Sequence, residues 1–112
     1  MDHLHKRLQA ISGGIQPLEQ ELVELFCQET RIHLSQMRSA LAYRDFKGLA
    51  FHGHALRGAS LTIGAEEFAE LCNTFEFAAI QDTSLLNAAL ESLEYSFQQL
   101  ERCLLSLGNN NT

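Results

Sequence analysis

The segment from Phe51 to Ser60, FHGHALRGAS, contains two histidines two residues apart, followed by an arginine and a glycine. Near pH 7 a neutral imidazole is a competent nucleophile. Imidazole nitrogens also bind transition metals. Which of these roles His52 or His54 can take depends on where each ring points. The direction of each ring depends in turn on the secondary structure around it.

Hydrophobic spacing predicts that both histidines lie on one helix, from about Phe46 to Ile63. The residues expected to face the core are Leu49, Gly53, Leu56, Ser60 and Ile63. Each residue of an α-helix turns by about 100°, so His52 lies about 60° from this stripe and His54 about 140° from it. We therefore expect His52 to be a hydrogen-bonded residue at the core boundary, and His54 to be exposed.

The expected neighbours of His54 indicate a docking surface. Arg57 and Gly58 follow it by three and four residues, so both lie on the adjacent turn. A glycine inside a helix costs about 1 kcal/mol relative to alanine, and the gain would be clearance for another molecule. Phe51 and Leu61 fall on the same outer side. Exposed apolar residues around a histidine favour docking, unless a further helix covers that side.

This arrangement suits phosphoryl chemistry. Attack by His54 on a phosphoryl group would give a phosphohistidine, and Arg57 could neutralise the new negative charge. The chain contains neither a GxxxxGK[ST] motif nor a kinase-type glycine loop. With 112 residues, one domain is expected. The phosphoryl group would therefore come from one protein and leave to another, without autokinase activity.

Composition excludes several other classes. The chain has 14 acidic and 8 basic residues and a net charge of −6, which argues against nucleic acid and against an anionic membrane surface. No apolar run approaches the roughly 20 residues of a membrane span, and the N-terminus lacks the core of a signal peptide. We expect a cytoplasmic protein, in which Cys27, Cys72 and Cys103 are ordinary helix residues.

The pattern along the rest of the chain predicts helices and no strand. The expected helices cover residues 2–11, 17–43, 46–63, 65–80 and 84–107, with Asp45 and Asp82 as N-caps and Gly64 ending the third. Short connections predict an all-α, antiparallel up-down four-helix bundle, with the short first helix across one end. We expect a single domain over 1–107 and a disordered tail over 108–112. The residues expected on the inner side of the second helix are Leu18, Leu22, Leu25, Phe26, Met37 and Leu41.

The string HALRG at 54–58, followed by GA at 64–65, resembles the motif of the histidine-containing phosphotransfer (HPt) domain, roughly H-x-L-K-G before a later G-A. The resemblance extends over about 18–105 and includes LCNTFE at 71–76. Two positions depart from the family pattern. Arg57 stands where lysine is commoner and is bulkier and planar. Gly53 stands where alanine is usual, and should weaken the helix slightly without changing the chemistry.

The resemblance implies a role for each residue near His54. It implies that His54 is the phosphoacceptor, attacking through Nε2, with Arg57 beside the phosphoryl group and Gly58 as the clearance position. It also implies that Glu76, on the next helix, accepts a hydrogen bond from Nδ1 and so leaves Nε2 free. Asn73, one turn before Glu76, could be a second contact.

The function that the resemblance implies is a relay between receiver-domain aspartates of a hybrid sensor histidine kinase and of a response regulator. Mg²⁺ would be held by the receiver, because this sequence has no convergent acidic site and no cofactor of its own is expected. We expect a monomer, and the initial methionine favours a free-standing protein. The residues expected to determine partner specificity are Phe51, Ala55, Arg57, Leu61 and Asn73.

Three other interpretations compete with the relay. A non-phosphorylated interaction or scaffold bundle would present the same surface, so it stays open. A dimerisation domain of a histidine kinase usually carries an acidic residue directly after its histidine, where this chain has Ala55. A metal- or haem-binding bundle using His33, His52 and His54 is disfavoured, because two residues of separation do not place two rings on one metal.

Overall fold

The computed structural model describes residues 2–109, and over this range the chain is helical, as predicted. The elements are α1 (Asp2–Ser12), α2 (Gln16–Ala42), α3 (Phe46–Ile63), α4 (Glu66–Gln81), the short 3₁₀ helix η1 (Thr83–Leu85) and α5 (Leu86–Asn109). The last helix therefore includes Gly108 and Asn109, which the sequence pattern assigns to the tail; residues 110–112 lie outside the described part. None of the described helices is long and apolar enough to cross a membrane.

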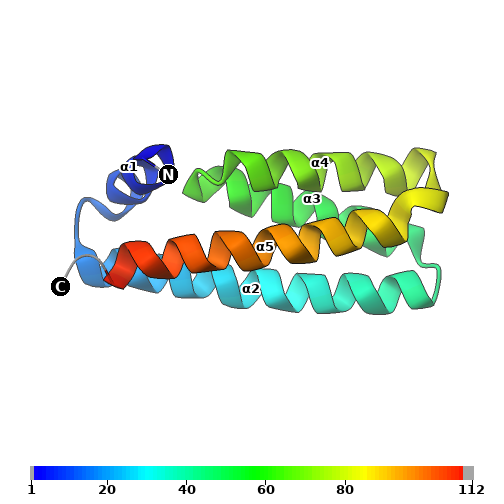
Figure 1. Ribbon diagram of the computed structural model, residues 1–112, viewed down its shortest axis with the longest axis horizontal. Helices are drawn as coiled ribbons and strands as arrows, with labels where there is room; N and C mark the ends of the chain where they lie inside the picture. The colour runs from blue at the N-terminus through cyan, green and yellow to red at the C-terminus, as the bar shows by residue number, and fades with distance from the viewer. Residues whose placement is uncertain (1, 110–112) are drawn as a thin grey trace.

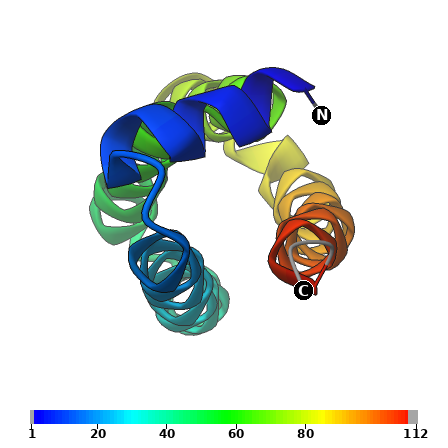
Figure 2. The same cartoon turned by 90° about the vertical axis from the view of Figure 1, so that its left-hand side faces the viewer.

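The four long helices lie side by side in one bundle (Figure 1). The colours in Figure 1 show that each of these helices runs in the opposite direction to the one before it. Within the bundle α2 packs against α3 and α5, and α4 packs against the same two helices. The short α1 crosses one end, where it contacts α2 and α3 (Figure 2). The faces of α3 and α4 that point away from the core therefore remain open along most of their length.

Both ends of α3 are fixed by the residues that the sequence identified. Asp45 precedes the helix, and its Oδ1 accepts a hydrogen bond from the Gly48 amide at 3.0 Å. This bond satisfies one of the free amides of the first turn. At the other end Gly64 has φ 87°, a left-handed conformation that glycine adopts without steric cost. The helix that carries both histidines therefore has a defined start and a defined end.

The buried stripe of α3 is the predicted one, formed by Leu49, Gly53, Leu56, Ser60 and Ile63. On α2 the predicted inner side is wrong in part, because Leu18 and Leu25 are 38% and 51% exposed. Leu22 and Leu41 are half-buried, and Phe26 and Met37 are buried as expected. The residues that α2 buries are Glu19, Val23, Phe26, Cys27, Thr30, Leu34 and Met37. The inner face includes polar side chains, so leucine spacing alone misplaced it.

The three cysteines are free, as expected, with Cys27 and Cys72 buried and Cys103 half-buried. Burial raises the pKa of the Cys72 thiol to about 12. Burial also raises the pKa of Cys27, an effect that the nearby Arg31 partly opposes. A thiol is reactive as its thiolate, so these two residues are packing elements near neutral pH.

We predict that Gly64→Ala destabilises the bundle. An L-residue in the left-handed region costs about 1–2 kcal/mol. The new Cβ would also lie 2.7 Å from Cβ of Arg7, the α1 residue whose Nε donates to the Thr62 carbonyl at 3.1 Å. Urea unfolding followed by circular dichroism should show a lower free energy of unfolding. Gly13→Ala is the control, because Gly13 also has a positive φ but a Cβ at this residue would meet no atom within 4 Å. A smaller loss for Gly64→Ala than for Gly13→Ala would contradict the predicted clash.

Candidate functional site

His54 lies near the middle of α3 on its outer side, where its side chain is 70% exposed. Its Nδ1 is 3.3 Å from Oε1 of Glu76 on α4 and 3.4 Å from Oε2 of the same carboxylate. A carboxylate only accepts, so Nδ1 carries the proton and donates it to Glu76. Within the described residues no side chain forms a hydrogen bond with Nε2. That nitrogen therefore keeps its lone pair and faces an open surface.

Gly53, the residue before His54, lies at the contact between α3 and α4. It is buried, and a Cβ at this position would lie 3.4 Å from Phe75 Cδ1 and 3.6 Å from both the Cys72 carbonyl oxygen and Glu76 Cβ. These are ordinary van der Waals distances, so an alanine would also fit here. Because the contacts include Glu76, the packing of the two helices at this point places the carboxylate beside His54. The departure from the usual alanine thus lies at the helix contact that supports the site.

Arg57 is the cation of this surface that has no carboxylate partner. It is half-buried, and no ion pair joins it to any described side chain. By contrast, Arg31 and Arg38 on α2 are paired with Glu101 and Glu94 on α5. The Arg57 guanidinium is therefore available to an anion from outside the chain, one turn away from His54.

No packing contact within the described residues explains why a glycine occupies position 58. It is exposed and helical, and a Cβ built on it would meet no atom within 4 Å. The cost of about 1 kcal/mol for a helical glycine is therefore not offset by internal packing. Because Gly58 has no side chain, nothing projects from the helix at this position. A docking molecule can therefore approach closely next to Arg57 and His54.

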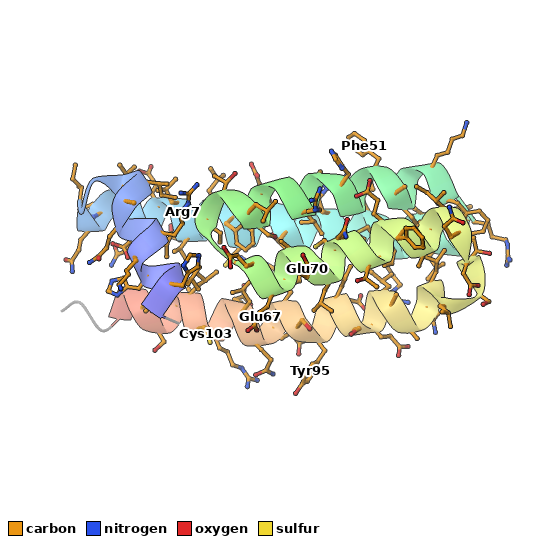
Figure 3. The ribbon with its side chains drawn as sticks, turned by 90° about the horizontal axis from the view of Figure 1, so that it is seen from above. Arg7, Phe51, Glu67, Glu70, Tyr95 and Cys103 are labelled. Carbon is orange, nitrogen blue, oxygen red and sulfur yellow. The ribbon has the colours of Figure 1, made fainter. Side chains whose placement is uncertain are left out.

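Two exposed apolar side chains flank His54 along α3, and two more are exposed on the neighbouring α4. Phe51 is 67% exposed and points away from the bundle (Figure 3), and Leu61 is also exposed. In the described residues no further helix covers this side, because α1 packs at the end of the bundle. On α4, Phe77 and Ile80 are each 66% exposed, and the sequence reasoning missed both. Their signal was available, since neither falls on the line of buried residues that runs through Phe75 and Ala79.

The remaining two predicted partner residues are placed less centrally. Ala55 is half-buried beside His54. Asn73 is exposed one turn before Glu76 and forms no hydrogen bond with His54, whose Nδ1 contacts are both with Glu76. The second contact predicted for Asn73 is therefore not a hydrogen bond in this structure.

His52 is the half-buried boundary residue that the helix geometry predicted, and its partner is His33 of α2. The two Nδ1 atoms are 2.9 Å apart. Burial lowers the pKa of His52, and His33 lowers it further, while Asp45 acts in the opposite direction. The three histidines of the metal-bundle interpretation do not converge, because His54 faces Glu76 instead.

We predict that Glu76→Leu changes the tautomer of His54. The proton of a neutral imidazole is placed by the hydrogen bond that the other nitrogen makes. Without the carboxylate, ring ¹⁵N shifts at about pH 8, where free histidine is neutral, should move from the Nδ1–H form towards the Nε2–H form. Glu76→Gln keeps an acceptor oxygen and should retain part of the Nδ1–H form. Unchanged shifts in Glu76→Leu would show that the contact does not orient the ring.

Comparisons with known proteins point to one family. A family model described as Hpt domain matches residues 21–110. The crystal structure of histidine-containing phosphotransfer protein B (HptB) from Pseudomonas aeruginosa PAO1 matches with a TM-score of 0.87 and 19% identity, over 96% of this chain and 94% of that one. At this identity the structural match shows the shared helical fold alone. Curated protein sequences gave no match. Because the family model spans most of the bundle, the chain belongs to the Hpt domain family.

Proposed function

We propose that this chain carries a phosphoryl group on His54 between receiver-domain aspartates of a hybrid sensor histidine kinase and of a response regulator. Hpt proteins are phosphotransfer intermediates that interact with receiver domains and histidine kinases. The observation that carries the proposal is the exposed His54 ring, whose Nδ1 lies 3.3 Å from Glu76 while Nε2 stays free. We also place the protein in the cytoplasm as a monomer.

The transfer is a displacement at phosphorus. The Nε2 lone pair attacks the phosphorus of an aspartyl phosphate, so an N–P bond forms as the P–O bond to aspartate breaks and its carboxylate leaves. The ring then carries a positive charge with its proton still on Nδ1, and the Glu76 carboxylate stabilises that charge. Arg57 contacts the phosphoryl oxygens. The same steps in reverse deliver the group to the second aspartate.

Mg²⁺ enters this proposal with the partner. The described residues contain no group of three histidine, cysteine, aspartate or glutamate side chains that could hold a metal ion. The carboxylates of the receiver would hold Mg²⁺ against the phosphoryl oxygens and neutralise charge during transfer. In this proposal the chain supplies the nucleophile, its orientation and one cation.

The surface around His54 suits a transient partner. Phe51, Leu61, Phe77 and Ile80 form an apolar rim that is exposed on two adjacent helices. A shuttle needs weak and short-lived complexes in order to release one partner before it meets the next, and small interfaces are typical of such encounters.

The first experiment measures phosphoryl transfer from a phosphorylated receiver domain in the presence of Mg²⁺. We expect an acid-labile phosphate, seen by intact mass, on the wild type and on His52→Gln but not on His54→Gln. The matched pair tests two histidines two residues apart on one helix. If a broad panel of receivers gave no label, the scaffold interpretation would replace the relay.

A second experiment separates docking from folding. Gly58→Leu should slow transfer by about tenfold or more, equivalent to about 1.4 kcal/mol, because the side chain fills the clearance beside His54. The free energy of unfolding should not fall, since leucine favours helix and the site is open. Gly53→Ala is the control: it removes the buried glycine at ordinary contact distances and should leave the rate nearly unchanged. Equal rates in Gly58→Leu and wild type would exclude approach over Gly58.

A further inference from the structure

The contact between His33 and His52 is a hydrogen bond that requires one shared proton. The Nδ1 atoms lie 2.9 Å apart, and the ring centroids are 5.1 Å apart with the planes at 63°. At this distance one nitrogen must donate and the other accept. The contact is therefore a hydrogen bond between α2 and α3.

This pair lies directly behind Phe51. The Phe51 ring packs edge-on against the His52 ring, with centroids 5.3 Å apart and an interplanar angle of 77°. The other side of Phe51 is open to solvent, and it points away from the bundle (Figure 3). The exposed phenyl ring of Phe51 therefore packs against the His52 ring, and the hydrogen bond with His33 fixes the position of the His52 ring.

We propose that His33 and His52 are a positioning pair, which holds Phe51 in the orientation that a receiver domain contacts and which opens when both rings are protonated. The inference rests on the proposed function, because the role of Phe51 in docking belongs to it. His33 and His52 touch neither the phosphoryl group nor the reacting nitrogen, and they act through Phe51.

The number of protons bound to the two rings determines whether the hydrogen bond between them can form. In the neutral pair one ring has Nδ1–H and the other has Nε2–H with a free Nδ1. A first added proton goes to Nε2 of the donor ring, which keeps the hydrogen bond and makes it charge-assisted. A second added proton leaves both Nδ1 atoms protonated. Neither nitrogen can then accept, and the two positively charged rings repel each other. The two rings therefore titrate as a coupled pair, and only the second step separates α2 from α3 at this point.

The surroundings of the pair determine how its contribution to stability changes with pH. Burial and His33 lower the pKa of His52, with burial the larger cause, and Asp45 partly opposes them. On α2 the charged residue one turn from His33 is Glu29, while on α3 the positions one turn from His52 are uncharged. Because the pKa of His52 is lowered in the folded chain, the unfolded chain, with a histidine pKa of about 6.5, binds a proton at this residue more readily. The contribution of the pair to stability is therefore present while His52 is neutral, and it is lost as the pH falls below about 6.5, through the lowered pKa of His52.

The first measurement uses the protein alone. Ring ¹⁵N spectra of His33 and His52 should show one Nδ1–H and one Nε2–H tautomer at about pH 8, where free histidine is neutral. On acidification the two rings should titrate in separate steps, and the Phe51 ring signals should change with the second. Two Nε2–H tautomers, or two independent titrations, would overturn the pair whether or not any receiver binds.

The second measurement is receiver affinity in a His54→Gln background, which removes the titration of the phosphoacceptor. With the pair intact, affinity should fall by about fivefold between roughly pH 7.5 and pH 5.5. His33→Asn retains an acceptor oxygen for His52 Nδ1–H in either charge state, so it should bind tightly at both pH values. His33→Ala has no acceptor and should bind weakly at both. The same pH dependence in all three proteins would overturn the positioning role.

The two measurements separate this inference from the proposed function. Failure of every receiver to bind would remove the proposed function and the docking role of Phe51 together, while the ring spectra would still decide whether the proton-sharing pair exists.

Discussion

The candidate site depends on the close contact between α3 and α4 at Gly53. A hydrogen bond between an imidazole and a carboxylate loses strength within a few tenths of an ångström beyond normal range. The 3.3 Å between His54 Nδ1 and Glu76 therefore requires the two helices to hold a fixed separation and register. The packing of α3 against α4 around Gly53 holds the separation, and the Asp45 cap and the left-handed turn at Gly64 fix where α3 begins and ends.

The features that the sequence predicted correctly are local ones. The bounds of α3, its two caps and the different exposures of His52 and His54 follow from side chains within one helix and from a rotation of about 100° per residue. The inner face of α2 was predicted less well. Thr30 and Glu19 are buried while Leu18 and Leu25 are exposed, because the packing partners decide which face of a long helix is covered.

Contacts between helices were beyond what periodicity could predict. Glu76 was identified through the family resemblance, not through the spacing of residues. His33 was considered only as a metal ligand, and its pairing with His52 becomes visible only when α2 and α3 are placed side by side. The exposure of Phe77 and Ile80 follows from the spacing along α4, but their position relative to His54 depends on how α3 and α4 pack.

The contact between His54 and Glu76 spans 22 residues, whereas the ion pairs between α2 and α5 span 70 and 56. The entropic cost of closing a loop rises with its length. Forming the contact between α3 and α4 therefore costs less entropy than forming the ion pairs between α2 and α5. The reactive centre is thus a locally encoded unit, and α2 and α5 bury its apolar side. The hydrogen bond that orients the nucleophile thus joins two helices that are consecutive in the chain, whereas the contacts that cover their apolar side join segments far apart in the sequence.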